Sequence, residues 1–333
     1  MRKKTWALLI PAILIIAYLL GPNPSTPVYS NAMPAVPAEP VALTNFIKQQ
    51  EAAHTVKPDN EARVVWANDS SKNKTEYALV YLHGFTASQG EGDPVHHDLA
   101  KKFGCNLYLS RLAEHGIDTT EPMVNLTADN YWESAKQALA IGKQIGNKVI
   151  LVGTSTGGTL ALQLAAAYPD VYALILLSPN IAINDPTAWI LNNPWGLQIA
   201  RLVTGSKYID SKDTREAFRK YWTYHYRIEA AVNLEELLET TMSKKTFEKV
   251  KQPTLTLYYY KDNIHQDSTV KVSAIKEMFT QLGTPVDKKR EVAMPNTGNH
   301  VIGSWIRSND VPGVEKETER FMTEVLGIKP LVN

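Results

Sequence analysis

The sequence contains a single cysteine, Cys105, among its 333 residues. One cysteine excludes an intrachain disulfide and any zinc site built on two or more thiolates. Cys105 stands in the apolar run CNLYL, a setting typical of a small buried strand residue. We therefore expect it to be structural and not a nucleophile.

An excess of charge of either sign is also missing. The chain carries 35 Lys and Arg against 34 Asp and Glu, a net charge of +1. Such a balance creates no broad positive field, so we expect no nucleic-acid partner. With 44% hydrophobic residues, the chain can bury a substantial core, in one large domain or two smaller ones.

The amino-terminal residues 1–21 have the pattern of a targeting segment. Cations at positions 2–4 precede an uncharged apolar run from Trp6 to Leu20, which orients the positive end toward the cytoplasm. The run is short for a spanning helix, which needs about 20 residues, but no small-residue cleavage site follows promptly. A retained membrane anchor and a cleaved signal therefore both remain open, and either one exports the rest of the chain.

Residues 22–40 are rich in proline and poor in large apolar side chains, which predicts an extended linker. We expect one folded domain over residues 41–333. Seven short β-branched or aromatic runs there predict strands, several of them apolar without alternation, as in a mostly parallel sheet covered on both faces. These runs span residues 63–67, 77–82, 105–112, 148–153, 172–178, 254–260 and 289–294.

Two helices and an insertion are expected between these strands. Residues 129–145 have helical apolar periodicity with Thr127 as a plausible cap, and residues 159–167 form a second helix ended by Pro169. Residues 182–250 break the alternation and hold nine aromatic residues. We interpret this stretch as a helical lid that lines an apolar acyl pocket and favours short or medium acyl chains over charged substrates, although the rings could instead pack only against one another.

The strongest chemical signal is Gly153-Thr154-Ser155-Thr156-Gly157, which matches G-x-S-x-G between a predicted strand and a predicted helix. That context is what the motif requires, because a tight strand-to-helix turn exposes the serine hydroxyl at the tip of the strand. We therefore expect Ser155 to be a nucleophile.

A serine nucleophile also needs donors for the oxyanion that forms. The turn His83-Gly84-Phe85-Thr86 follows an apolar strand, and a backbone N–H there can point at the oxyanion. We expect the amides of Phe85 and Thr156 to be the two donors. The imidazole of His83 is expected to be structural.

Ser155 needs a base, and the base needs an orienting acid. His300 follows the last predicted strand in a glycine-bearing loop and is our candidate base, with His225 and His265 as rivals. For the acid we favour Asp262, two residues after the run TLTLYYY, over Asp267. The chain order Ser, Asp, His is the order found in the α/β-hydrolase fold.

From about residue 60 onward the sequence resembles the α/β-hydrolase superfamily, and most closely its monoacylglycerol lipase, carboxylesterase and S33-type branch. The segments that carry this resemblance are YLHGFTAS, RLAEHGID, VGTSTGG, YYYKDN and NTGNHVI. Glu114 of RLAEHGID replaces the first glycine of the Gly-His-Gly that this branch usually has. The resemblance implies an eight-stranded, mostly parallel sheet, a lid, and neither metal nor organic cofactor.

The expected activity is hydrolysis of a small carboxylic ester or acylglycerol-like substrate through an acyl-enzyme. A peptidase or amidase would use the same residues, and a non-catalytic binding protein or receptor could retain the fold. The oligomeric state stays open. His96-His97-Asp98 invites a metal interpretation, but adjacent histidines do not easily face one ion from a helix, so we expect a solvated helix surface there.

Overall fold

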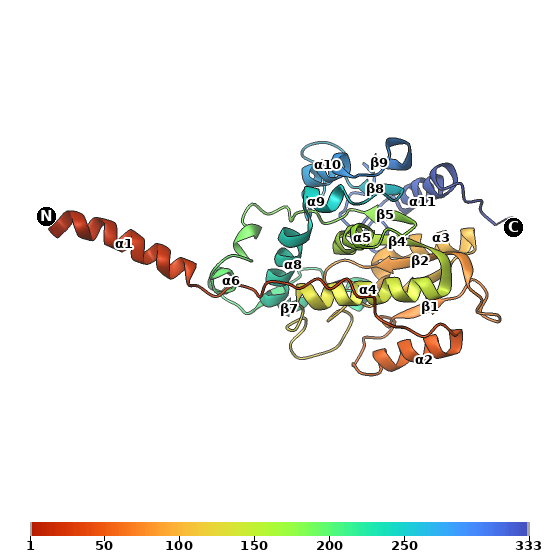
Figure 1. Ribbon diagram of the computed structural model, residues 1–333, viewed down its shortest axis with the longest axis horizontal. Helices are drawn as coiled ribbons and strands as arrows, with labels where there is room; N and C mark the ends of the chain where they lie inside the picture. Colours follow the sequence, from red (N-terminus) through yellow and green to blue (C-terminus); the bar gives the residue numbers. More distant parts are fainter. Residues whose placement is uncertain (1, 332–333) are drawn as a thin grey trace.

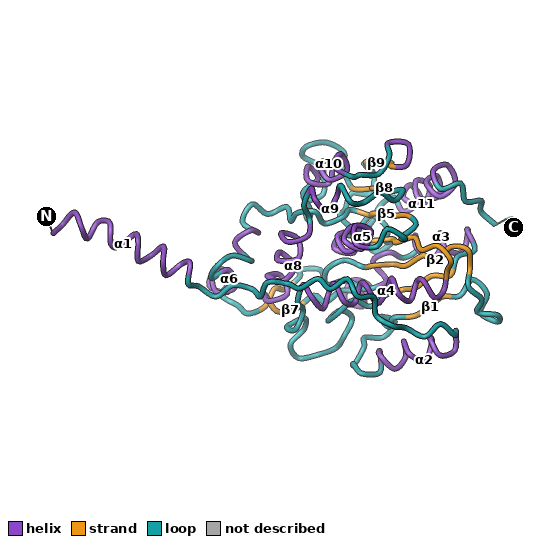
Figure 2. Tube along the Cα trace, in the orientation of Figure 1, coloured by secondary structure: helices purple, strands orange, loops and turns teal. Residues whose placement is uncertain are grey.

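A computed structural model describes residues 2–331. Met1, the first residue of the predicted targeting segment, and residues 332–333, the last two of the predicted domain, lie outside the described residues. The core is a central sheet, drawn in orange in Figure 2, in the order β1-β3-β2-β4-β5-β8-β9. Only the β1–β3 pair is antiparallel. The strands are β1 (Arg63–Val65), β2 (Thr75–Leu82), β3 (Asn106–Leu109), β4 (Gly146–Thr154), β5 (Ala173–Leu177), β8 (Thr254–Tyr258) and β9 (Lys289–Ala293).

Helices cover both faces of this sheet (Figure 1). Alternate residues of a strand face opposite sides, so Val80 of β2 joins one apolar cluster and Leu79 joins the other. The first cluster includes side chains from α2 (Pro40–Glu51), α4 (Ala128–Ile145), α5 (Thr156–Ala167) and α10 (Val272–Gln281). The second includes side chains from α3 (Val95–Phe103), α11 (Val311–Arg320) and the π-helical turn η4 (Phe321–Val325). This three-layer arrangement is the α/β-hydrolase fold that the resemblance implied.

The seven predicted strands are all present, and their bounds differ from the sequence patterns by a few residues. The eighth strand implied by the resemblance is wrong for the described residues, where the central sheet has seven. The predicted helix at 129–145 is α4. Thr127 caps it, accepting the Asn130 N–H at 3.1 Å while the Asn130 side chain accepts the Thr127 N–H at 2.9 Å.

The predicted insertion lies between β5 and β8. It is not purely helical, because β6 (Tyr208–Asp210) and β7 (His225–Arg227) pair as a small antiparallel sheet. Its other elements are the 3-10 turn η2 (Ala188–Ile190), α6 (Gly196–Thr204), α7 (Glu216–Tyr221), α8 (Ile228–Thr241) and α9 (Lys244–Phe247). We call residues 182–250 the cap. Two further 3-10 turns, η1 (Gln89–Gly92) and η3 (Val286–Lys288), lie outside it.

The amino-terminal part of the chain divides into a helix and an extended segment. The helix α1 (Arg2–Leu19) projects away from the body of the molecule (Figure 1). Among the described residues, no helix combines the length and apolar character needed to cross a membrane.

Residues 22–39 are extended, as expected, but they do not form a free linker. The Trp132 indole donates to the Ser30 carbonyl at 2.8 Å, and the Lys136 ammonium donates to the Ala32 carbonyl at 2.9 Å. The Tyr29 ring packs edge-on against Trp132. The idea of a linker that only spaces the domain is therefore wrong, because this segment is fixed along α4.

Candidate active site

Ser155 lies between β4 and α5, as the motif predicted. Its φ of 53° and ψ of −120° are unusual for a residue with a side chain, and such backbone strain is characteristic of functional turns. The turn needs small neighbours, since a Cβ on Gly157 would lie 1.9 Å from the Leu82 carbonyl oxygen. The glycines of the motif therefore allow β2 and α5 to approach closely while Ser155 stands at the strand tip.

His300 lies against Asp267, and this pair corrects the first choice made from the sequence. The Nδ1 atom of His300 is 2.5 Å from Oδ2 of Asp267, whose side chain is fully buried. The other carboxylate oxygen accepts the N–H groups of Thr269 at 2.8 Å and Val270 at 3.1 Å. Asp267 is thus held in one orientation with its free oxygen directed at the imidazole, as an orienting acid requires.

Asp262, the favoured acid, lies elsewhere. Its side chain is 49% exposed, and its carboxylate accepts the backbone N–H of His265 at 2.7 Å and contacts the His265 ring. These contacts, the His265 amide first, lower the pKa of Asp262 to about 2. The preference for Asp262 over Asp267 is therefore wrong, because Asp267 and not Asp262 contacts His300.

The reason is a small hairpin that the strand pattern concealed. The strand β8 ends at Tyr258, and residues 260 and 266 then pair as an antiparallel bridge. The intervening turn carries Asp262 to its exposed tip, and the Asp267 N–H donates to the Tyr259 carbonyl at 3.1 Å. Asp267 consequently returns to the sheet edge although it is farther along the chain. The turn-forming Asp262-Asn263 pair was the available signal.

The protonation of His300 follows from its surroundings. Burial acts to lower the pKa of the imidazole, but the Asp267 carboxylate, assisted by Glu91, outweighs it and raises the pKa above the usual value of 6.5. A neutral His300 with Nδ1–H donated to Asp267 leaves Nε2 free to accept a proton. The rival histidines lie apart from this pair: His265 contacts Asp262, and His225 contacts Asp210.

The predicted oxyanion donors flank the serine. Phe85 lines the same cavity as Ser155, and its N–H donates to no other described residue. Thr156 is the first residue of α5, where a backbone N–H has no intrahelical partner and the helix dipole favours negative charge. Both positions suit oxyanion donors, and their role remains part of the proposal below.

The loop that bears Phe85 is fixed by buried polar groups. His83 accepts the Leu112 N–H on Nε2 at 3.0 Å, and its Nδ1 lies 3.0 Å from the Gly84 carbonyl. Burial lowers the pKa of His83 to about 4, so the ring is neutral. The structural role expected for His83 is confirmed. Across the loop, the Gly84 N–H donates to Oε2 of Glu91 at 2.5 Å.

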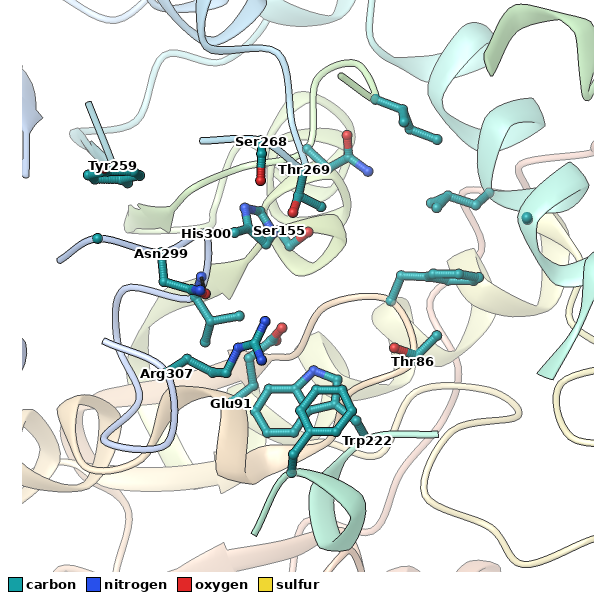
Figure 3. Close-up of a pocket in the computed structure, with 18 of the residues that line it drawn as sticks. Thr86, Glu91, Ser155, Trp222, Tyr259, Ser268, Thr269, Asn299, His300 and Arg307 are labelled. Atoms are coloured by element: carbon teal, nitrogen blue, oxygen red, sulfur yellow. Dashed lines mark hydrogen bonds between the residues drawn. The ribbon is translucent and has the colours of Figure 1, made fainter. Parts of the chain in front are cut away.

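Ser155 and His300 open into one cavity of about 440 Å³, a size suited to a small organic substrate. Figure 3 shows them near its centre, with Glu91, Arg307, Trp222 and Thr86 below them in this view. The apolar lining is Phe85, Ile183, Phe218, Trp222, Tyr226, Ala231, Leu234, Tyr259 and Val301, and the polar lining is Thr86, Glu91, Ser155, Asn180, Gln266, Ser268, Thr269, Asn299, His300 and Arg307.

The cap contributes some, but not most, of its aromatic residues to this cavity. Phe218, Trp222 and Tyr226 line it. Trp189 and Trp195 do not, and their exposed fractions are 55% and 40%. The cap therefore covers part of the site, and most of its rings serve packing or face solvent.

Sequence reasoning missed two ionisable residues of the cavity, Glu91 and Arg307. Glu91 is buried in η1, and burial raises the pKa of its carboxyl to about 7. Arg307 lies in the loop that follows His300. Neither belongs to a recognisable motif, so only their placement beside Ser155 marks them.

One cluster could in principle hold a metal ion. Ligand atoms of Asp93, His96 and His97 lie within 4.8 Å of one another. The expected solvated helix surface is wrong at His96, which is fully buried. Nε2 of His96 already contacts the Gln89 carbonyl at 2.8 Å, and Asp93 accepts the Trp305 indole N–H at 2.9 Å. These bonds fix η1 and the start of α3, and nothing in the chemistry of Ser155 and His300 calls for a metal or cofactor.

Comparison with known families agrees with this geometry. Residues 73–294 match the family described as serine aminopeptidase, S33. The chain belongs to this family of α/β hydrolases. Its fold, and the strand-to-helix turn that carries Ser155, are therefore those of a family of hydrolytic enzymes.

Individual relatives include esterases and lipases. The chain is 31% identical over 108 residues to a thermostable monoacylglycerol lipase of Bacillus sp. strain H-257; the match covers 32% of this chain and only 42% of that protein. Among solved structures, it resembles one reported for the metagenome-derived lipolytic enzymes LipS and LipT, with a TM-score of 0.65, 17% identity, and coverage of 81% and 99% of the two chains. It also resembles a Paleococcus ferrophilus monoacylglycerol lipase, with a TM-score of 0.57, 13% identity, and coverage of 79% and 99%. At these identities the structures show the shared fold.

The departure at Glu114 has a structural explanation. Glu114 has a φ of 64° and Gly116 a φ of 66°, so both ends of the Glu-His-Gly segment are left-handed. Glycine adopts this conformation freely, whereas a residue with a Cβ does so at a cost. Between them, His115 is buried and its Nδ1 lies 2.7 Å from the Ala113 carbonyl. Position 114 therefore keeps the left-handed backbone conformation that a glycine adopts freely, although a glutamate stands there.

Cys105 is 3% exposed, and burial raises the pKa of its thiol to about 12. A buried thiol of that kind is unreactive. The structural role predicted for this cysteine is confirmed.

Proposed function

We propose that the protein is a serine hydrolase that cleaves carboxylic esters through an acyl-enzyme. The observation that carries the proposal is the cavity itself: it joins Ser155, on a strained turn at the tip of β4, to His300, which Asp267 orients. A nucleophile, a base and an orienting acid from three separate segments are the parts this chemistry requires.

In the proposed reaction, Oγ of Ser155 attacks the ester carbonyl carbon while Nε2 of His300 takes the hydroxyl proton. Negative charge develops on the carbonyl oxygen, where the amides of Phe85 and Thr156 can donate. The tetrahedral intermediate then expels the alcohol, which receives its proton from His300. Water repeats the sequence on the acyl-enzyme with His300 as base, releasing the carboxylic acid and restoring Ser155.

The relatives favour an ester as the substrate, since those named above are a monoacylglycerol lipase and lipolytic enzymes. The family description favours a second candidate, aminopeptidase activity on the same residues. An aminopeptidase must hold a substrate ammonium group. Among the residues that line the cavity, Glu91 has the only carboxylate, it is bound to Gly84, and Arg307 adds a positive charge. This charge pattern supports the ester.

Turnover of p-nitrophenyl acetate, butyrate and octanoate, measured beside aminoacyl p-nitroanilides, tests this choice. The proposal predicts hydrolysis of at least the shorter esters and little release of nitroaniline. A higher kcat/KM for the anilides would replace the esterase by the aminopeptidase, and no turnover of either would favour a binding protein.

We also propose export of the chain, from its basic and apolar amino terminus. Support comes from α1, which lies outside the folded body (Figure 1). Fractionation of cells expressing the full chain or a variant without residues 1–21 tests this: the variant should stay in the cytoplasm. An identical distribution of the two proteins would contradict export through this segment.

A further inference from the structure

Arg307 is the cationic residue of the cavity, and no part of the proposed reaction uses it. It follows His300 by seven positions in the same loop and lines the cavity with Ser155. Its side chain is 28% exposed, and its positive charge acts against protonation of His300. Arg307 therefore faces the space in which a substrate would lie beside the base.

The guanidinium of Arg307 is held by groups from the cap. Its Nη1 donates to Oδ2 of Asp213, and its Cζ atom lies over the Phe218 ring, 5.3 Å from the centroid. A guanidinium held by a hydrogen bond and an aromatic ring loses little further freedom on binding an anion. Arg307 is thus preorganised.

Asp213 is shared with a second arginine, which leaves one positive charge uncompensated. Arg215 binds Asp213 through Nε at 3.0 Å and Nη2 at 2.6 Å, and its Nη1 donates to the Ile306 carbonyl at 2.8 Å. All three nitrogens of Arg215 are therefore occupied. One carboxylate between two guanidinium groups leaves a net positive charge on this cluster of three side chains.

The unoccupied edge of Arg307 has the geometry for a carboxylate. Its Nε and Nη2 donate to no other described residue. Together they form one side of the planar guanidinium, the side that Arg215 uses to bind Asp213. Two parallel N–H groups match the two oxygens of a carboxylate. The cavity carboxylate of Glu91 is instead directed at the Gly84 N–H, at 2.5 Å.

We propose that Arg307 binds a carboxylate of the substrate, so that the preferred esters are small molecules carrying a carboxylate near the scissile bond. This inference rests on the proposed ester hydrolysis and names its substrate class. The sequence analysis expected charged substrates to be disfavoured. The present proposal differs for substrates that carry a carboxylate, which it expects to be preferred. The apolar cap residues remain available to the uncharged part of the molecule.

Isosteric substrate pairs test the proposal. Ethyl hydrogen glutarate and ethyl glutaramate place a carboxylate or a neutral carboxamide on the acyl side of the ester. Butyryloxyacetic acid and butyryloxyacetamide do the same on the alcohol side. In at least one pair, kcat/KM should favour the carboxylate by about tenfold or more, as expected for one charge-assisted pair of hydrogen bonds. A ratio near one, or a preference for the amide, in both pairs would overturn the proposal.

Variants assign the preference to Arg307. Arg307→Met should abolish it while changing turnover of the carboxamide much less, and Arg307→Lys should keep only part of it, because lysine retains the charge but lacks the planar fork. The matched control is Arg219→Met. Arg219 lies in the cap, over the Tyr224 ring at 4.6 Å, and does not line this cavity. An equal loss of preference in the control would reduce the effect to overall charge and contradict the proposal.

Calorimetric binding of glutarate and glutaramide to Ser155→Ala separates this inference from the proposed function. Tighter binding of glutarate that disappears on adding Arg307→Met supports the carboxylate site even if no ester is turned over. Equal binding of the two compounds overturns it even if ester hydrolysis is established.

Discussion

Asp267 and His300 form a pair shielded from solvent, with Oδ2 and Nδ1 2.5 Å apart. The carboxylate arrives from the loop after β8 and the imidazole from the loop after β9, two strands that pair in parallel. Because the carboxyl ends of parallel strands share one edge of the sheet, loops far apart in sequence bring these groups together. Ser155 reaches the same edge from β4.

The first prediction concerns this pair. Asp267→Asn should lower kcat for a short p-nitrophenyl ester by roughly 10³- to 10⁴-fold, because an amide cannot hold the imidazole in the required tautomer. Asp262→Asn should change kcat little, since its carboxylate is exposed and serves the turn at His265. Steady-state kinetics of both variants provide the measurement. The reverse ranking would make Asp262 the acid.

The pH dependence should report the charge of Glu91. His300 acts as a base only when neutral, so kcat/KM should rise as the pH passes through the pKa of His300. The negative charge of Glu91 is one of the groups that raise this pKa. Glu91→Gln removes a negative charge, lowers the pKa of His300 and should therefore move the acid limb to lower pH. Since Glu91 itself has a pKa of about 7, the wild-type limb reflects both groups.

The pH–rate profile of Asp262→Asn is the control for that shift, because its lost charge is not among the groups that act on His300. Its acid limb should coincide with the wild-type limb. A shift of the Glu91→Gln limb to higher pH would contradict the assigned interaction.

Acyl preference should depend on the cap residues that line the cavity. Trp222 is 5% exposed and stacks on Phe218 with centroids 4.9 Å apart. Trp222→Leu should change the ratio of kcat/KM between acetyl and octanoyl esters, by up to roughly tenfold. Trp189→Leu should leave that ratio unchanged, because Trp189 is 55% exposed and outside the cavity. If Trp222→Leu lowers all esters equally, its role is packing alone.

The free energy of unfolding should increase when position 114 carries a residue that adopts a left-handed backbone conformation without strain. Glu114→Gly relieves a left-handed φ of 64° and should raise the free energy of unfolding by about 0.5–1 kcal/mol. Gln137→Gly, inside α4, should instead lower it by about 1 kcal/mol. Urea denaturation of the two variants provides the comparison. Destabilisation by Glu114→Gly would mean that the glutamate side chain contributes more than its strain costs.

Local patterns predicted most of the fold and two of the three central side chains. Ser155 was found because its motif requires a strand and a helix on either side, and both left clear patterns. The sequence favoured Asp262 because it is closer along the chain to the end of the strand. The hairpin at residues 260–266 instead carries Asp262 away from the sheet and returns Asp267 to its edge. The packing of residues 28–36 was missed because it depends on contacts such as Tyr29 with Thr240, at 2.7 Å. Arg307 was missed because its position depends on Asp213 and Phe218 in the cap.

The central claim is that Ser155 is the nucleophile of a serine hydrolase. The most direct measurement is mass spectrometry of the protein after treatment with an active-site fluorophosphonate, with a peptide map to locate the label. The account predicts one label, on Ser155, together with loss of ester turnover. The same treatment should leave Ser155→Ala, which keeps the packing of the turn, unlabelled and inactive. A label on another residue, or near-normal turnover by Ser155→Ala, would contradict the account.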